Sequence, residues 1–192
     1  MPARLLLAVV VLVVPSKLQT RFDLLDTLRD GEWWTPAELI DDTGRSQQSI
    51  SSVLAALDRL DLIEWVKPPG QVILRKSRIR ATDKGLRWLW CVDRDLPGQA
   101  ADTVFLVLDL LADGPIVTSQ LRRQERRGHF AEVVLTLRAA GVLKLVKRAG
   151  RTGDQSGFVH VTDLGRALYR EMLEEPCFKT LTKTSSRVGS TQ

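Results

Sequence analysis

Three stretches near the start of the chain place apolar residues at every third or fourth position, which is typical of helices. The first is predicted to run from Ser16, a helix cap, to Gly31, since the apolar positions between them follow a helical period: Leu18, Phe22, Leu25 and Leu28. The second begins at Thr35-Pro36-Ala37-Glu38, a capping box with proline at the first helical position, and ends near Gly44. The third begins at Ser46 and buries one apolar stripe, formed by Ile50, Val53, Leu54 and Leu57.

Two β-rich stretches follow the third helix. They cover residues 62–66 and 71–80, and Lys67-Pro68-Pro69-Gly70 between them is typical of a turn, so the pair predicts a hairpin. Thr82-Asp83-Lys84-Gly85 then opens a closing helix. The predicted fold class is therefore mainly α with small β-hairpins (α+β).

The chain also contains an internal repeat. At an offset of 83 residues, seven residues recur: Phe22, Leu25, Asp26, Leu28, Asp30, Gly31 and Thr35 match Phe105, Leu108, Asp109, Leu111, Asp113, Gly114 and Thr118. At an offset of 80, seven more recur: Val53, Leu57, Val66, Lys67, Thr82, Asp83 and Gly85 match Val133, Leu137, Val146, Lys147, Thr162, Asp163 and Gly165. Similarity on this scale predicts two related structural units, the second three residues shorter between the two matched blocks.

We therefore expect two tandem domains, at 16–92 and 101–174, joined by a linker at 93–100 that holds a proline and a glycine. The last segment, 175–192, is rich in Ser, Thr and Lys without apolar periodicity and is predicted to be a disordered tail. The first segment, 1–15, is apolar, but its run over 5–14 is too short to span a bilayer and no signal-peptide cleavage site follows it. Three interpretations of this run stay open: a buried element, a surface that joins two copies into a homodimer, and a secretion signal.

Composition narrows the class of protein. The chain has 192 residues with 28 basic and 23 acidic side chains, and 44% of its residues are apolar, as in a globular protein. Cys91 and Cys177 share no metal-ligand spacing, and His129 and His160 cannot complete a zinc set with them. We find no phosphate-binding loop and no nucleophile constellation, so we expect no catalytic residue, no metal, no cofactor and no enzymatic activity. A cytoplasmic, nucleoid-associated location without a membrane partner fits this picture.

Three helices followed by a hairpin, with a glycine turn between the second and third helices, are the pattern of a winged helix-turn-helix. The segments 35–39, 46–57, 60–64 and 82–85 resemble bacterial and archaeal regulators of the MarR, PadR and ArsR type. The resemblance covers 16–92 well and 101–174 more loosely. It implies two tandem winged helix-turn-helix domains, with the third helix of such a domain in the DNA major groove and the wing on the flanking backbone.

The residues themselves support this expectation in the first domain. The helix over 46–57 turns an uncharged polar face away from its apolar stripe, and Gln and Ser suit base edges, so we expect Gln47, Gln48, Ser51 and Ser52 to read bases. The alternative is an ordinary solvated face. Between 67 and 87 there are seven basic residues and one acidic residue, which favours a phosphate-facing wing. The predicted backbone contacts are Arg45, Ser46, Lys67, Arg75, Lys76, Arg78 and Arg80.

The second domain differs from the first. Nine basic residues oppose two acidic ones over 122–151, and the predicted basic patch consists of Arg122, Arg123, Arg126, Arg127, Lys147, Arg148 and Arg151. The three-residue deletion falls in the helix-turn-helix, however, and Glu132 would face the groove. Binding of the DNA backbone or of a partner, and full reading of DNA, both stay open for this domain.

The function predicted from the sequence is sequence-specific binding of double-stranded DNA by a transcriptional regulator, with two winged helices on neighbouring half-sites. A plasmid or phage replication initiator is a close alternative. A second class is a protein-interaction scaffold of the chromosome-condensation or sorting-complex type. The tryptophans, all within the predicted first domain, either fill its core or line an effector pocket: Trp33, Trp34, Trp65, Trp88 and Trp90.

Overall fold

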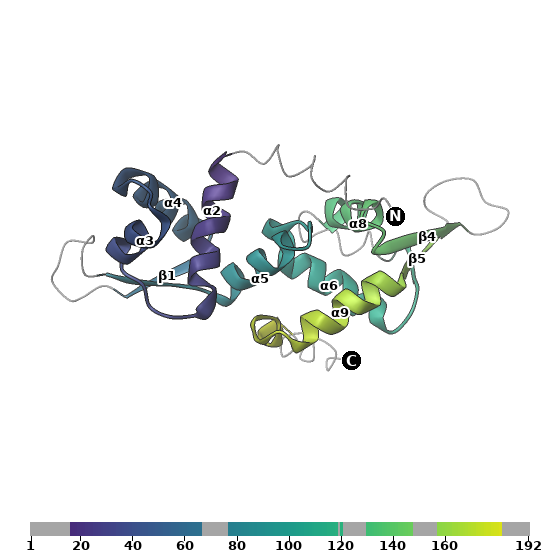
Figure 1. The fold of residues 1–192 in the computed structure, drawn as a ribbon. Coiled ribbons are helices and arrows are strands. Elements are labelled where there is room, and N and C mark those ends of the chain that lie inside the picture. The colour runs from purple at the N-terminus through teal and green to yellow at the C-terminus, as the bar shows by residue number, and fades with distance from the viewer. Residues whose placement is uncertain (1–15, 67–76, 119, 121–129, 148–156, 182–192) are drawn as a thin grey trace, which may run out of the picture. The chain divides into compact units, whose positions relative to one another are not determined.

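The computed structural model describes residues 16–66, 77–118, 120, 130–147 and 157–181 (Figure 1). Its internal contacts divide the chain into a first unit, Met1–Leu89, and a second unit, Trp90–Gln192. Both units combine helices with a small antiparallel sheet, which confirms the predicted α+β class. The division falls within one helix, ahead of the predicted linker at 93–100, and Leu96 in that linker is buried.

The first unit consists of three helices, a hairpin and the start of a fourth helix. In chain order these are α2 (Ser16–Thr27), the 3-10 turn η2 (Leu28–Asp30), α3 (Pro36–Thr43), α4 (Gln47–Arg59), β1 (Ile63–Val66), β2 (Arg78–Ala81) and α5 (Asp83–Val92). The two strands are antiparallel, with Ile63 opposite Ala81, and Trp34 adds an isolated bridge to Ile79 on β2. The predicted helices are thus present and the two strands pair, but the second strand begins at Arg78, and the predicted turn at 67–70 and the rest of the stretch 71–76 lie outside the described residues.

A leucine core holds the helices of the first unit together, and local capping signals set where α3 begins and ends. Leucines of α2 and η2 pack with the apolar sides of α3 and α4, and the fully buried members are Leu24, Leu25, Leu28, Leu39 and Leu57. The capping box of α3 is confirmed: Glu38 N donates to Thr35 Oγ1 at 3.3 Å, and Thr35 N donates to a Glu38 carboxylate oxygen at 2.6 Å. Gly44 ends α3 in the left-handed conformation, with φ 62°.

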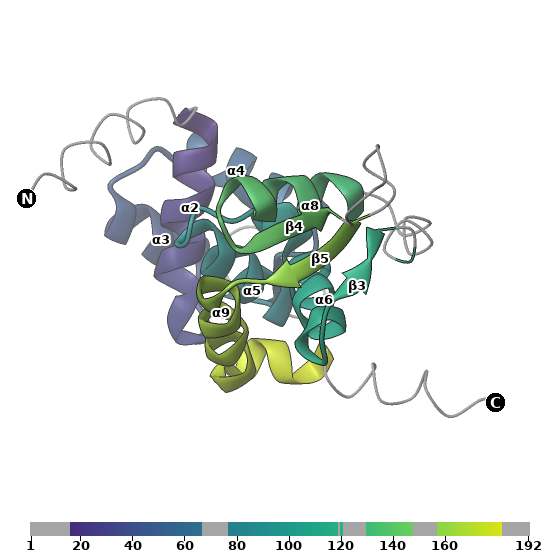
Figure 2. The same cartoon turned by 90° about the vertical axis from the view of Figure 1, so that its right-hand side faces the viewer.

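The described elements of the second unit follow the same order as their counterparts in the first, around a three-stranded sheet, with no described counterpart of α3 (Figure 2). Beyond the end of α5 it contains η3 (Gly98–Ala100), α6 (Ala101–Ala112), β3 (Ile116–Val117), α8 (Phe130–Ala139), β4 (Leu143–Lys147), β5 (Gly157–Val161), α9 (Asp163–Glu174) and η6 (Pro176–Phe178). The strand order is β3-β5-β4, all antiparallel, with Ile116 opposite Val159 and Leu143 opposite Val161. In the first unit the bridge of Trp34 takes the place of β3.

Matching hydrogen bonds show how closely the two units correspond. The hydroxyl of Thr82 donates to the carbonyl of Asp61, and that of Thr162 donates to the carbonyl of Gly141, both at 2.8 Å. The same hydroxyls accept from Gly85 N at 3.1 Å and from Gly165 N at 3.2 Å, at the starts of α5 and α9. The repeat found in the sequence is therefore a repeat of structure.

The predicted disordered tail, 175–192, is corrected over its first residues. Phe178 in η6 is fully buried: its ring centroid lies 5.6 Å from that of Phe105 and 5.4 Å from that of Trp90. Cys177 beside it is buried as well. Cys177 and Phe178 anchor the start of this polar segment to the core. The sequence did not indicate this, because two adjacent apolar residues make no periodic pattern. Residues 182–192 lie outside the described part of the chain.

The same aromatic cluster changes the interpretation of the tryptophans. Trp90, which the sequence placed with the first domain, belongs to the second unit, where it contacts Phe178 and carries the Arg94 guanidinium 3.9 Å from its ring centroid. Trp88, in the first unit, is also buried, so both residues of α5 fill cores.

The predicted apolar segment, 1–15, lies outside the described residues. Within the described part of the chain, no helix combines the length and the apolar character needed to cross a bilayer.

Candidate nucleic-acid interface

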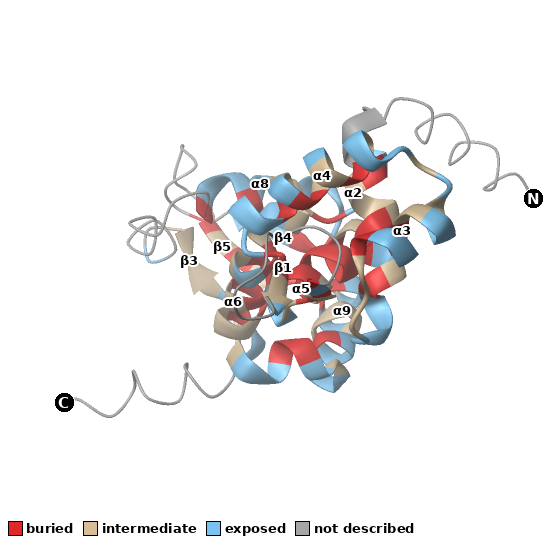
Figure 3. Ribbon diagram, turned by 90° about the vertical axis from the view of Figure 1, so that its left-hand side faces the viewer, coloured by how far each residue is buried: buried red, intermediate tan, exposed pale blue. Residues whose placement is uncertain are grey.

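The exposed face of α4 carries the residues predicted to read bases. Ser46 caps the helix, with its hydroxyl accepting from Ser49 N at 3.3 Å, and the buried side of α4 is held by Ile50, Leu54 and Leu57. Gln47, Gln48 and Ser52 are exposed, while Ser51 is half-buried. Figure 3 shows α4 coloured by burial, with exposed positions along the helix. The helix therefore presents amide and hydroxyl groups without a formal charge to an approaching molecule.

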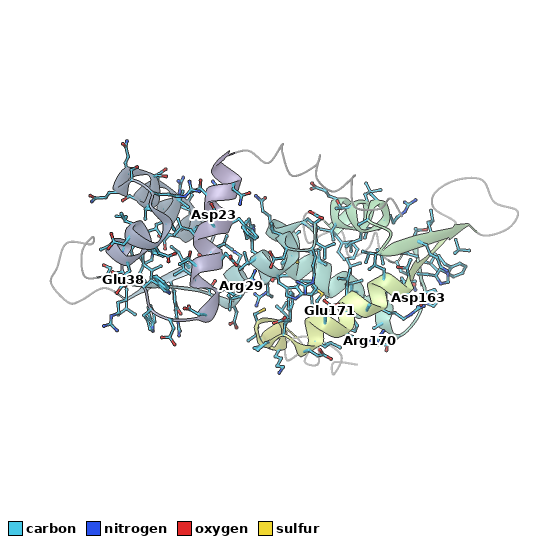
Figure 4. All side chains as sticks on the ribbon, in the orientation of Figure 1. Asp23, Arg29, Glu38, Asp163, Arg170 and Glu171 are labelled. Carbon is cyan, nitrogen blue, oxygen red and sulfur yellow. The ribbon has the colours of Figure 1, made fainter. Side chains whose placement is uncertain are left out.

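Arg45, predicted to contact the DNA backbone, forms contacts within its own unit. Its Nη2 lies 2.6 Å from Asp23 Oδ2, and its Nη1 donates to Thr20 Oγ1 at 3.0 Å. Both partners belong to α2, where Figure 4 labels Asp23, and the ion pair is about one-third exposed. Arg45 thus ties the turn between α3 and α4 to α2, directly before the first residue of the exposed face.

Several basic side chains of the hairpin region are also occupied within the first unit. Arg80 forms an ion pair with Glu64 on the neighbouring strand and lies over the Trp33 ring at 4.6 Å. Lys84 lies 3.4 Å from a carboxylate oxygen of Asp61. Arg87, which contributed to the predicted positive balance, is buried, so that balance overstates the charge available at the surface.

Arg78 differs from these neighbours. It is exposed on β2, and among the described residues its side chain forms no hydrogen bond or ion pair. Its charge reaches the start of α3: hydrogen bonds from the Thr35 backbone and then from the Thr35 hydroxyl lower the pKa of Glu38, and Arg78 lowers it further. Among the described basic residues of the hairpin region, Arg78 is thus the one whose charge is left available at the surface. The predicted contacts Lys67, Arg75 and Lys76 lie outside the described residues.

The corresponding face in the second unit has a different chemistry. At the repeat offset of 80, the positions of Ser51, Ser52 and Ala55 are taken by Ala131, Glu132 and Leu135 on α8. All three are exposed, Leu135 to 61%. Of the predicted basic patch, Lys147 ends β4, and the other members lie outside the described residues: Arg122, Arg123, Arg126, Arg127, Arg148 and Arg151.

The structure therefore keeps the predicted α4 face and Arg78 at the surface of the first unit and gives Arg45 and Arg80 partners inside it. The ion pairs of Arg45 and Arg80 were missed because their partners lie 22 and 16 residues away in the chain. The predicted strands, 62–66 and 71–80 around a turn at 67–70, did not indicate the register in which Glu64 lies opposite Arg80, since the second strand begins at Arg78. Comparisons of the chain with protein-family models, with curated proteins and with solved structures give no match.

Proposed function

We propose that the first unit is a winged helix-turn-helix that binds double-stranded DNA in a sequence-dependent manner, and that the protein is a transcriptional regulator. The element order supports this: three helices, a glycine turn before α4, and a hairpin with a third bridge from Trp34. In such a domain α4 is the helix that enters the major groove.

The observation that carries the proposal is the exposed face of α4. A glutamine side chain can bond an adenine edge in two places, and a serine hydroxyl can donate to or accept from several bases. Gln47, Gln48 and Ser52 are exposed on a helix whose opposite side is locked in the core. A negatively charged side chain here would repel the duplex, and this part of the face has none.

The wing contributes affinity more than sequence preference in this proposal. Arg78 is available to a phosphate, and Lys67, Arg75 and Lys76 add positive charge to the same segment of the sequence. Arg45 and Arg80 support the interface without contacting DNA, because their ion pairs hold the turn before α4 and the base of the hairpin in place. We therefore propose fewer phosphate ligands in the first unit than the sequence predicted.

The second unit is not a base reader in this proposal. Glu132 stands at the position of Ser52, where a carboxylate would face the phosphates, and Leu135 replaces a small residue with an exposed apolar one. In this proposal only the first unit reads bases. Each chain therefore binds one DNA half-site, and not the two neighbouring half-sites expected from the sequence.

A selection from random duplexes with the full chain tests the proposal. We expect one enriched sequence family, and Gln48→Ala should reduce the preference for it over random DNA by about tenfold, the value of one good base contact. Gln99→Ala, which removes an exposed glutamine from the second unit, is the matched control and should change nothing. Failure to bind any duplex even at low salt would reject the proposal in favour of the protein-interaction scaffold.

A further inference from the structure

The three-stranded sheet of the second unit has one face in the core and one face directed outward. Burial alternates along β5, the central strand, so that Phe158 and His160 lie on the face opposite to the buried Val159. Their partners in the register lie on the same face, since Val117 and Val146 are opposite Phe158 and Lys144 is opposite His160. We call these five residues the outer sheet face. Lys144 and Val146 are exposed, and the other three are half-buried.

The equivalent face of the first unit is satisfied by its own side chains, whereas the outer sheet face is not. In the first unit Glu64 pairs with Arg80 across the hairpin, and Arg80 lies over the Trp33 ring. At the repeat offset of 80, Lys144 takes the position of Glu64 and His160 that of Arg80. In the part of the chain that the structure describes, neither of these two forms a hydrogen bond or an ion pair. The acid of the first unit is thus replaced by a base, and no internal pair neutralises it.

We propose that the outer sheet face binds single-stranded nucleic acid, with two successive bases stacked on Phe158 and His160 and a phosphate beside Lys144. Aromatic side chains on the face of a sheet are a platform for unpaired bases, and histidine serves in this role as phenylalanine does. The two rings are two residues apart on one strand, which separates them by about 7 Å along it. Bases of a duplex already stack on each other, so only a single strand can offer their faces to these rings.

Charge favours a nucleic acid over a protein partner for this face. The outer sheet face contains an exposed lysine and no acidic residue, and the sequence over 122–151 has nine basic residues against two acidic ones. Stacking accepts any base, so this site adds affinity for unpaired strands without reading sequence. The proposal does not rest on the binding of duplex DNA by the first unit, which uses other residues.

Fluorescence anisotropy of the full chain with labelled thymidine DNA and uridine RNA, each of about 12 nucleotides, tests the proposal at about 50 mM salt. We expect binding, and the tighter oligomer shows which sugar is preferred. Phe158→Leu should weaken binding about tenfold, because leucine keeps the apolar bulk and loses the aromatic face. Phe158→Tyr keeps a ring and should stay within about twofold of the wild type. Binding of the selected duplex should be unchanged in both variants, which separates this test from that of the proposed function.

The salt dependence of the same binding tests the role of Lys144. Lys144→Gln should reduce the slope of log affinity against log salt by about 0.7, the value of one phosphate of a single strand. Arg170→Gln, which removes an exposed basic side chain from α9 of the same unit, is the matched control and should leave the slope unchanged. Absence of binding to both oligomers, Phe158→Leu binding as the wild type does, or Phe158→Tyr binding as weakly as Phe158→Leu would overturn the proposal. So would an equal loss of slope in the Lys144 and Arg170 variants.

Discussion

At the scale of single residues, two glycines show how the repeat is maintained. Gly85 and Gly165 occupy equivalent positions at the starts of α5 and α9. A Cβ added at Gly85 would lie 2.1 Å from the carbonyl oxygen of Leu62, and one added at Gly165 would lie 2.5 Å from that of Val142. The backbone of the turn after α4 or α8 thus passes too close for any side chain, and this explains the shared glycine.

We expect Gly85→Ala to destabilise the first unit by about 3 kcal/mol, because the backbone must move to admit the methyl group. Gly31→Ala is the control. No atom lies within 4 Å of its Cβ position, so only the left-handed backbone is strained, at a cost of about 1 kcal/mol. Urea unfolding followed by circular dichroism measures both, and equal effects would contradict the close approach.

Tyr169 offers a clean residue-scale titration, because it is the only tyrosine in the chain. Its hydroxyl donates to Asp109 Oδ1 at 2.5 Å, and burial first, then this hydrogen bond, raise the pKa of Tyr169 above its ordinary value of 10. The neutral form is favoured in the folded state. Its contribution to stability is therefore complete below pH 10 and is lost as the pH rises through the raised pKa.

Absorbance near 295 nm, where tyrosinate absorbs, should accordingly show no ionisation of the folded protein until well above pH 10. Asp109→Asn should bring the transition to lower pH, since the nearby negative charge is removed. Asp102→Asn, on the same helix, is the control and should leave the transition in place. A wild-type transition at pH 10 would show that the Tyr169 hydroxyl is solvated.

At the scale of elements, the position of α4 depends on a contact between the turn before it and α2. The guanidinium of Arg45 joins the turn before α4 to Asp23 and Thr20 on α2. We expect a double-mutant cycle of Arg45→Ala and Asp23→Ala to give a coupling free energy of about 0.5 kcal/mol, as the ion pair is partly exposed.

Salt dependence of DNA binding distinguishes this internal role from phosphate binding. Arg78→Ala should reduce the slope of log affinity against log salt by about one, because one phosphate contact is lost. Arg45→Ala should leave that slope unchanged while lowering affinity through the position of α4. An equal loss of slope in both variants would show that Arg45 contacts a phosphate.

Elements were predictable from the sequence where their signals are local. The capping box at Thr35, the glycine turn at Gly44 and the cap at Ser46 each occupy a few consecutive residues, and all three are present. Signals that depend on the folded chain were not readable. Burial of Arg87 is decided by what packs around it, so counting its charge overstated the positive charge at the surface of the hairpin region. The polar face of α4 was predictable because it follows from the helical period of the apolar residues opposite to it.

At the scale of the whole molecule, two copies of one architecture carry different surfaces. Their buried positions correspond, as with Leu25 and Leu108 or Leu57 and Leu137. Their outward helix faces diverge from serine to glutamate and from alanine to leucine. Core positions are constrained by packing, whereas exposed positions are free to acquire separate partners.

The second unit also depends on a residue that follows its last long helix. We expect Phe178→Ala to destabilise this unit by about 4 kcal/mol, because the ring is fully buried between Phe105 and Trp90. Leu173→Ala, at a partly exposed position on α9, should cost less than about 1 kcal/mol. Thermal unfolding of the two variants compares them, and similar midpoints would contradict the anchoring of η6.

The division of the chain inside α5 affects how the protein can be dissected. A fragment begun at residue 101, after the predicted linker, would lack Trp90 and leave an edge of Phe178 open to water. Such a fragment would expose an aromatic surface and tend to aggregate. A fragment begun at Asp83 would retain all of α5, and with it the Trp90 ring that covers Phe178 in the second core.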